Sequence, residues 1–312
     1  MLPQAAIVII AGPTGVGKSV LALGLAERFG MEIISADSRQ VYRELDIGTA
    51  KPGRVERARV PHHLVDYVEP DESYSVARFR DDAEAVLDEL AARRVGALVV
   101  GGTGHYVQAL SDRIEPPRVP PQPELRAALE RLAAERGANA LHAQLEQLDP
   151  ASAQAIPPSN VRRAIRAIEV ARATGQPFSR IGRRRGKRRM ALRVALTLSR
   201  EELYRRVDAR VDRMLAAGWL DEVRGLLRRG YDPDLPALAA TGYRELIAHL
   251  RGELSLEDAV QRIKWATHAY IRRQYVWLRR QPGYRWLEAG PSAYTRVEPL
   301  VRRYLETIAR RA

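Results

Sequence analysis

Residues 12–19 have the types and the spacing of a phosphate-binding loop. They read Gly-Pro-Thr-Gly-Val-Gly-Lys-Ser, which fits the pattern G-x-x-x-x-G-K-[ST], and they lie between an apolar run at 6–10 and a helix-like pattern at 20–26. Glycines let backbone N–H groups turn toward a phosphate, Lys18 adds a full positive charge, and the Ser19 hydroxyl can ligate Mg²⁺. The loop leaves the reaction open, because kinases, NTPases and transferases that release diphosphate can all use it. The residues predicted to bind a diphosphate or a nucleotide are Gly12, Pro13, Thr14, Gly15, Val16, Gly17, Lys18 and Ser19.

A carboxylate and a hydroxyl follow two further apolar runs. Residues 33–36 read as a short buried strand that ends at Asp37, and residues 97–100 as another that ends in Gly-Gly-Thr-Gly with Thr103. The carboxyl ends of parallel strands meet at one edge of a sheet, so the phosphate loop, Asp37 and Thr103 should converge there. Asp37 could hold Mg²⁺ directly or through water, accept a proton from an attacking nucleophile, do both, or merely cap the next segment. Thr103 stands where many NTPases have a metal-binding Asp, which disfavours ATP hydrolysis and leaves Thr103 as a neutral hydrogen-bonding group for a substrate.

The elements that must position these residues alternate between strand and helix. A long amphipathic helix is predicted at 73–94, between the second and third apolar runs. The pattern indicates an α/β fold, in which a parallel sheet like that of P-loop NTPases is flanked by helices and joined by a helical insertion and a helical C-terminal region.

The alternation of strand and helix patterns stops at residue 113, where a proline-rich linker begins. Helical patterns follow at 124–136, 138–148 and 160–174, and a basic run at 183–189 returns to an expected strand at 190–198. We therefore predict a core formed by 1–112 and 189–312 and a helical insertion formed by 113–188. Beyond the returning strand we expect helices only, chiefly at 201–228 and 255–280.

The amino-acid composition excludes some kinds of site and favours one class of binding partner. The chain has 312 residues, a formal net charge of +13 and no cysteine, so a disulfide framework and a cysteine-ligated zinc site are excluded. No stretch approaches the roughly 18 apolar residues of a membrane span, and no signal peptide is recognisable, so we expect a soluble cytoplasmic protein without a membrane partner. The positive charge favours nucleic acid as a partner, with a merely solvated basic surface as the alternative.

The final long helix combines basic and aromatic side chains. Arginines at 272, 273, 279 and 280 are interleaved with Trp265, Tyr270, Tyr275 and Trp277. Such a mixture suits RNA, where phosphates meet arginines and unstacked bases meet rings, although aromatics at helical spacing are often core residues. We expect the tryptophans to be mainly buried and the arginines to be exposed.

Several blocks of the sequence stand in a characteristic order. They are the phosphate loop, Asp37-Ser38-Arg39-Gln40-Val41-Tyr42, Asp46-Ile47-Gly48-Thr49-Ala50-Lys51-Pro52, Pro61-His62-His63-Leu64-Val65-Asp66, Gly101-Gly102-Thr103-Gly104, Arg162 to Val170, Arg206 to Met214, Gly242-Tyr243-Arg244-Glu245, and Arg272-Arg273-Gln274 with Trp277. In order and spacing these blocks resemble the tRNA dimethylallyltransferase family, also called the tRNA isopentenyltransferase or IPP transferase family. Together they cover most of the chain.

The resemblance implies transfer of a dimethylallyl group from its diphosphate to N6 of the adenosine at tRNA position 37, with release of diphosphate and Mg²⁺ present. It implies that Asp37 accepts the N6 proton, that Thr103 orients the adenine, and that Lys18, Arg206 and Arg210 act on the diphosphate. The expected metal contacts are Ser19 and Asp37, and the expected assembly is a monomer. The expected tRNA contacts are Asp37, Ser38, Arg39, Gln40, Thr103, Arg126, Arg162, Arg163, Ala164, Ile165, Arg166, Gly242, Tyr243, Arg244, Arg272, Arg273, Gln274, Trp277 and Arg279.

Rival functions remain from the sequence. An adenylate isopentenyltransferase acting on free nucleotides would need neither the insertion nor the basic helix, which argues against it. A P-loop kinase of small molecules or nucleosides shares the phosphate loop, and a non-catalytic RNA-binding protein could keep the same fold.

Overall fold

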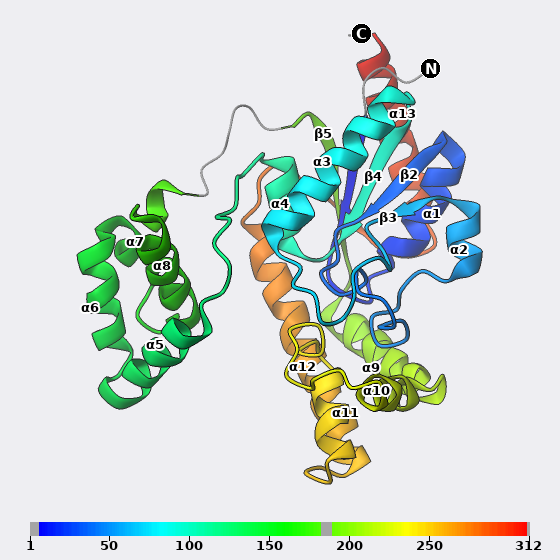
Figure 1. Cartoon of the computed structure of the whole chain (residues 1–312). Coiled ribbons are helices and arrows are strands. Elements are labelled where there is room, and N and C mark those ends of the chain that lie inside the picture. The colour runs from blue at the N-terminus through cyan, green and yellow to red at the C-terminus, as the bar shows by residue number, and fades with distance from the viewer. Residues whose placement is uncertain (1–5, 182–188, 311–312) are drawn as a thin grey trace. The chain divides into compact units, whose positions relative to one another are not determined.

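The strands form a six-stranded sheet in which every neighbouring pair runs parallel, in the order β3-β2-β4-β1-β5-β6, within the described residues 6–181 and 189–310 of this computed structural model (Figure 1). The strands are β1 (Ile7–Ala11), β2 (Met31–Ser35), β3 (His62–His63), β4 (Gly96–Gly101), β5 (Ala191–Thr197) and β6 (Arg285–Glu288). Because β2, β4 and β1 are adjacent, the segments that follow them lie side by side. The predicted α/β class is confirmed.

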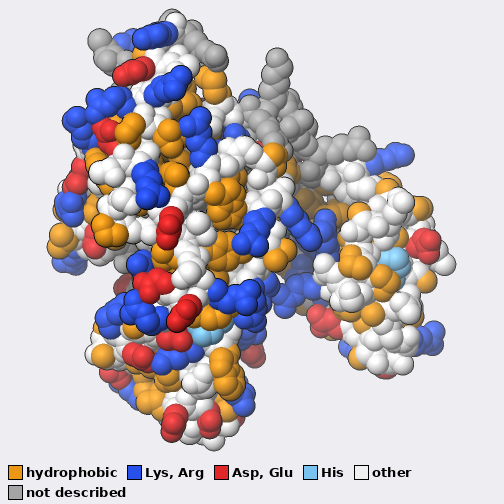
Figure 2. Space-filling model, turned by 180° about the vertical axis from the view of Figure 1, so that it is seen from behind, with side chains coloured by type: hydrophobic (Ala, Val, Ile, Leu, Met, Phe, Trp, Pro, Cys, Tyr) orange, Lys and Arg blue, Asp and Glu red, His pale blue; other side chains and the backbone are white. Residues whose placement is uncertain are grey.

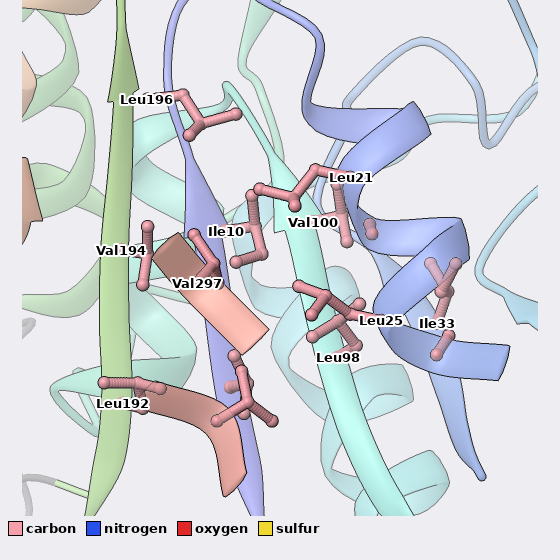
Figure 3. Close-up of a cluster of buried hydrophobic side chains, with 14 of the residues drawn as sticks. Ile10, Leu21, Leu25, Ile33, Leu98, Val100, Leu192, Val194, Leu196 and Val297 are labelled. Atoms are coloured by element: carbon pink, nitrogen blue, oxygen red, sulfur yellow. The ribbon is translucent and has the colours of Figure 1, made fainter. Parts of the chain in front are cut away.

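Helices cover both faces of the sheet, which explains the uninterrupted apolar runs of its strands. Val8 and Ile10 of β1 pack in a cluster with α1 (Lys18–Phe29) and α13 (Ala293–Ala309), part of which Figure 3 shows. Ile7 and Ile9 point to the opposite face, where α3 (Val76–Ala92) and α4 (Gly104–Ser111) pack. The sheet therefore holds its strand ends in a layer buried from both sides.

The C-terminal helices α9 (Arg200–Ala216), α10 (Trp219–Arg228), α11 (Tyr243–Leu250) and α12 (Leu256–Arg279) form a further cluster with the segment that follows β2. The segment expected to be helical at 201–228 forms two helices, which meet at Gly218, whose φ of 98° is left-handed. The expectation of helices alone after β5 is wrong, because β6 adds an edge strand to the sheet. The short helix α2 (Arg54–Arg59) was also not predicted.

The chain divides into two compact units, one made of 1–110 and 190–312 and the other of 111–189. The second unit contains α5 (Pro123–Arg136), α6 (Ala138–Leu148), α7 (Pro150–Ala155), α8 (Val161–Thr174) and η1 (Phe178–Arg180), packed around Leu129, Leu141, Leu145 and Ile168. The bounds of α6 are those predicted, whereas α7 was not predicted. Of the basic run, 183–188 lie outside the described residues.

In the part of the chain that the structure describes, no helix is both long and apolar enough to cross a membrane. Lys and Arg side chains are spread over much of the surface visible in Figure 2, with Asp and Glu among them. On that face the positive charge is therefore not confined to one patch.

Candidate active site

The phosphate-loop residues 12–19 join β1 to the first turn of α1, in the predicted order of strand, loop and helix. The backbone is left-handed at three glycines, with φ of 153° at Gly12, 78° at Gly15 and 100° at Gly17. Lys18 begins α1, and its Nζ donates to the carbonyl of Pro13 at 2.8 Å, so the ammonium group lies over the loop. The loop thus combines a helix N-terminus with a cation, which is an arrangement that binds phosphate.

Lys18 belongs to an electrostatic cluster with Asp37 and Arg210. Burial lowers the pKa of Lys18 to about 8; the charge of Asp37 opposes this shift and that of Arg210 adds to it. Burial also lowers the pKa of Arg210, again with Asp37 opposing. An anion bound here would compensate two cations that are partly removed from water.

The two arginines of α9 differ in their surroundings. Arg206 Nε donates to Glu202 Oε1 at 2.6 Å, one turn away on the same helix. Arg210 makes no hydrogen bond or ion pair within the described residues and remains available to a ligand. Arg210 therefore acts electrostatically on Lys18, whereas Arg206 is held in a pair with Glu202.

Asp37 caps the turn that follows β2. Its Oδ1 accepts from the backbone N–H of Arg39 at 2.8 Å and of Gln40 at 3.4 Å. The side chains of the same two residues are also fixed by hydrogen bonds. Arg39 donates to the carbonyl of Ala237, and Gln40 donates to the carbonyl of Thr49. The capping role weighed for Asp37 is thus present, and it leaves Oδ2 as an acceptor for a ligand.

Thr103 follows β4 and lies beside the Asp37 turn, as predicted. Its Oγ1 accepts from the backbone N–H of Ser38 at 3.2 Å, and its own N–H donates to the carbonyl of Ala36 at 3.3 Å. Adjacent parallel strands thereby bring a carboxylate and a hydroxyl to the same edge of the sheet as the phosphate loop.

Gln274 of α12 connects two of these loops. Its Oε1 accepts from the N–H of Thr14 at 2.9 Å, and its Nε2 donates to the carbonyl of Gly102 at 3.0 Å. A Cβ on Gly102 would lie 2.3 Å from that Nε2, so a larger residue at 102 would displace the Gln274 amide from this bond. Both ends of the Gln274 side chain are used inside the protein and the residue is buried, so its expected contact with RNA stays a prediction without support from this geometry.

Tyr270 was not assigned to the site from the sequence. It lies one turn before Gln274 on α12, and its pKa is raised to about 12, chiefly by burial and then by the charge of Asp37. Arg273 lies over its ring at 5.8 Å from the centroid. The spacing of four residues from Gln274 was the sequence signal that could have placed Tyr270 on the inner face of the helix.

Glu222 of α10 was also missed, and no local pattern marks it. Its carboxylate accepts from the backbone N–H groups of Asp46 at 2.9 Å, Ile47 at 2.6 Å and Gly48 at 3.3 Å, and from the Tyr243 hydroxyl at 2.7 Å. One carboxylate therefore anchors the loop at 46–51 to the C-terminal helices. That loop in turn accepts from Gln40.

Other predicted RNA-contact residues are buried and have packing roles instead. Tyr243 is fully buried, and a Cβ on Gly242 would lie 2.0 Å from the Trp219 ring. Ala164 and Ile165 face the core of the second unit. The side chains of Tyr243, Ala164 and Ile165 are buried, so their expected contact with RNA stays a prediction without support from this geometry.

Arg126 and Arg166 of the second unit share a buried carboxylate. Glu169 is fully buried and accepts from Arg126 Nε at 2.7 Å, from Arg126 Nη2 at 2.8 Å and from Arg166 Nη1. Burial opposes ionisation of Glu169, yet the hydrogen bonds from Arg126, the Gln122 backbone and Arg166 lower its pKa to about 2. Two arginines on one carboxylate leave a net positive charge at this point of the insertion.

The remaining predicted arginines are exposed. In the second unit these are Arg162 and Arg163, and in the first Arg244, Arg272, Arg273 and Arg279. A cavity of about 390 Å³ on α12 is lined by Ala269, Arg272, Arg273, Val276, Trp277 and Arg280. The expectation of buried tryptophans on this helix is wrong, because Trp265 is 62% exposed and Trp277 only half-buried.

Oxygen ligands for a metal are few. Ser19 is exposed at the start of α1, and the Asp37 carboxylate lies near Lys18. Among the described residues there is no group of three or more His, Cys, Asp or Glu that could hold a metal ion. A Mg²⁺ ion here would need phosphate oxygens and water to complete its shell, which is common for this ion.

Comparison with known families gives two matches. The family described as IPP transferase matches residues 40–281, and the family described as isopentenyl transferase matches residues 5–61. A tRNA dimethylallyltransferase of Roseiflexus sp. (strain RS-1) is 51% identical over 292 residues, which cover 94% of this chain and 95% of the relative. That of Thermomicrobium roseum is 47% identical over 300 residues, covering 96% and 91%.

Solved structures resemble the chain over nearly its full length. A tRNA isopentenylpyrophosphate transferase from Bacillus halodurans has 36% identity and a TM-score of 0.72, covering 98% of this chain and 99% of that one. A eukaryotic dimethylallyltransferase acting on tRNA has 28% identity and a TM-score of 0.81, covering 97% and 80%.

Proposed function

Because the chain belongs to the IPP transferase family, we propose that it transfers a dimethylallyl group from dimethylallyl diphosphate to N6 of the adenosine at tRNA position 37, releasing diphosphate. The observation that carries this proposal is the convergence of the phosphate loop, Asp37 and Thr103 at one edge of the sheet. A site that holds a diphosphate beside a proton acceptor can break a carbon–oxygen bond and form a carbon–nitrogen bond.

In the reaction, N6 attacks the allylic carbon while the bond from that carbon to the diphosphate oxygen breaks. The electron pair of the broken bond leaves with the diphosphate, and N6 loses one proton to Asp37. Charge therefore grows on the diphosphate, where loop amides, Lys18 and Arg210 lie. Groups aimed at developing charge in a partly dry site lower the barrier most.

The proposal includes one Mg²⁺ ion, which the Ser19 hydroxyl would hold, with Asp37 as a further ligand through water. When bound, the ion neutralises charge on the leaving group. The protein ligands named here fit this role, because Mg²⁺ sites on phosphates need only one or two protein oxygens.

The adenosine must leave the anticodon stack before N6 can meet Asp37. Unstacking costs a few kcal/mol, which contacts elsewhere on the RNA must offset. We assign these contacts to exposed arginines on α12, with Arg272 and Arg273 at their centre, and to Arg162 and Arg163 of the insertion. The exposed Trp265 adds a ring on which an unpaired base can stack.

The test incubates purified protein with Mg²⁺, radiolabelled dimethylallyl diphosphate and one of three acceptors. The acceptors are an unmodified tRNA transcript with adenosine at position 37, the same transcript with guanosine there, and AMP. Label in the first transcript alone is expected. Label in AMP alone would identify the free-nucleotide enzyme, and label in none, with phosphate transfer from ATP to small acceptors, would identify a kinase.

A further inference from the structure

The side chain of Gln274 lies between the phosphate loop and the glycine-rich loop at 101–104, and the residue is only 8% exposed. Its Oε1 accepts from the Thr14 N–H, and its Nε2 donates to the Gly102 carbonyl. An amide has one accepting and one donating end, so both ends are matched to their partners. A carboxylate would lack the donor, and an aliphatic side chain would lack both functions.

The first of these bonds fixes the peptide unit that holds Lys18. The Pro13 carbonyl and the Thr14 N–H belong to one planar peptide. Gln274 holds this peptide at its N–H, and the carbonyl accepts from Lys18 Nζ at 2.8 Å. Rotation of the peptide plane would move the acceptor of the Lys18 ammonium group. Gln274 therefore acts, through one peptide unit, on the cation proposed to meet the diphosphate.

The second bond fixes the peptide unit that leads into Thr103. The Gly102 carbonyl and the Thr103 N–H again belong to one peptide. Its carbonyl accepts from Gln274, and its N–H donates to the carbonyl of Ala36 at 3.3 Å. Ala36 directly precedes Asp37. The bond from Gln274 thus helps to hold Thr103 beside the strand end that carries the proposed proton acceptor.

Two glycines allow α12 to approach this loop so closely. A Cβ added to Gly102 would lie 2.3 Å from Gln274 Nε2, and a Cβ added to Gly104 would lie 2.3 Å from the Trp277 ring, on the next turn of the same helix. Neither glycine has a left-handed φ. A small side chain at 102 would therefore push the Gln274 amide away without straining the backbone.

We propose that Gln274 is a positioning residue for the transfer reaction: its amide sets the position of Lys18 at the diphosphate relative to Thr103 at the adenine, so that N6 faces the allylic carbon. This inference rests on the proposed function, since it concerns how the same site aligns its two substrates. A misplacement of about 1 Å between reacting groups can cost a rate about a hundredfold. Loss of the amide should therefore slow the bound complex more than it weakens either substrate's binding.

The first test measures three quantities for the wild type and for Gln274→Ala. They are the single-turnover rate constant at saturating tRNA and dimethylallyl diphosphate, the Kd for tRNA, and the Kd for inorganic diphosphate. The rate constant should fall about tenfold to a hundredfold, while both Kd values stay within about threefold. A variant that is merely less stable would instead lose reaction amplitude at an unchanged rate constant.

Two further variants complete this test. Gln274→Glu keeps the size of the side chain and the acceptor for Thr14 but removes the donor to Gly102, so its rate constant should also fall, about tenfold. Gln261→Ala is the matched control, because Gln261 is an exposed residue of the same type on α12 and should not alter the rate constant.

The second test approaches the same contact from the other side. Gly102→Ala in the otherwise wild-type protein should displace the amide and slow the reaction about as much as Gln274→Ala. In the Gln274→Ala background the amide is gone, and the nearest remaining atom is the Gly12 carbonyl oxygen at 3.2 Å. Gly102→Ala should then change the rate constant by no more than about twofold.

Three results would overturn the inference. They are rate constants of Gln274→Ala and Gln274→Glu within about twofold of wild type, a loss confined to amplitude or to substrate affinity, and additive effects of Gly102→Ala and Gln274→Ala. Each of them leaves labelling of tRNA by the wild-type protein intact, so the proposed function would stand.

Discussion

The two carboxylate oxygens of Asp37 have different roles, one in holding a turn and one in the proposed chemistry. Its Oδ1 holds the turn by accepting from Arg39 and Gln40, while Oδ2 is the atom available to a substrate proton. Because the carboxylate is already fixed, orienting it for the reaction costs little free energy. Substitutions that keep the turn can therefore separate structure from chemistry.

Asp37→Asn keeps an oxygen for the turn but removes the proton acceptor. We expect kcat to fall by about two to four orders of magnitude, the range typical of lost general-base catalysis, with tRNA affinity within a few-fold of wild type. Single-turnover labelling and a tRNA binding assay measure the two quantities. Unchanged turnover would exclude Asp37 as the proton acceptor.

Lys18 predicts a pH dependence. Its pKa of about 8 means that the free enzyme loses this positive charge as the pH rises through 8, so kcat/KM for dimethylallyl diphosphate should fall above that pH. A profile recorded from pH 6.5 to 9.5 tests this, with Lys18→Met as the variant expected to lack the step. A wild-type profile that stays flat to pH 9.5 would contradict it.

The lowered pKa of Lys18 also makes the free energy of unfolding depend on pH. The folded state lowers the pKa of Lys18 from 10.5, so between pH 8 and 10.5 the unfolded chain binds more protons. Stability from this group therefore rises with pH across that window.

Helix α12 works with two faces. Gln274 points inward, where it bonds the Thr14 N–H of the phosphate loop and the Gly102 carbonyl before Thr103, whereas Arg272 and Arg273 are exposed. One rigid element thus joins the surface proposed for RNA to both substrate loops. Side chains on a helix hold position better than side chains on loops, which suits a site that must align two substrates.

Helix α10 fixes the loop at 46–51 through the Glu222 carboxylate. Glu222→Ala would leave three backbone N–H groups and the Tyr243 hydroxyl without their acceptor. We expect the free energy of unfolding to drop by about 1 to 3 kcal/mol, measured by urea denaturation.

Asp221→Ala is the control for this change. Its side chain is 76% exposed and pairs only with Arg224 on the surface, so it should change stability by less than about 1 kcal/mol. Equal effects of the two substitutions would show that the anchoring of the loop is not a source of stability.

Across the whole molecule, the net charge of +13 is spread over the surface rather than gathered in one patch on the visible face (Figure 2). Total charge therefore raises nonspecific attraction to RNA, and particular arginines must supply the ordered contacts. Two separately packed units offer such arginines, on α12 in one and at Arg162 and Arg163 in the other.

Arg273→Ala should weaken tRNA binding and lower the slope of log Kd against log salt by about one phosphate contact. Arg303→Ala removes another exposed charge, on α13 and outside the proposed RNA surface, and should leave the slope close to that of wild type. The Kd for tRNA is measured at salt concentrations from about 50 to about 300 mM, and the slope is taken from that series. Equal slopes for wild type and Arg273→Ala would remove that arginine from the RNA.

The sequence by itself determined the phosphate loop, the positions of Asp37 and Thr103 at strand ends, and the α/β class. It could do so because these features depend on near neighbours: glycine permits left-handed backbone, and apolar periodicity marks strands and helices. The family blocks added the reaction. Boundaries of α3, α5, α6 and α8 followed from caps and periodicity to within a few residues.

Only the tertiary structure decided which side chains complete the site. Gln274 meets Thr14 across 260 residues, and Glu222 meets a loop some 175 residues earlier in the chain. Likewise, Tyr243 and Ile165 became core residues, while Trp265 of α12 became exposed. The reason is physical: such contacts depend on how whole elements pack, and residue types along the chain do not specify which distant partner each face will meet.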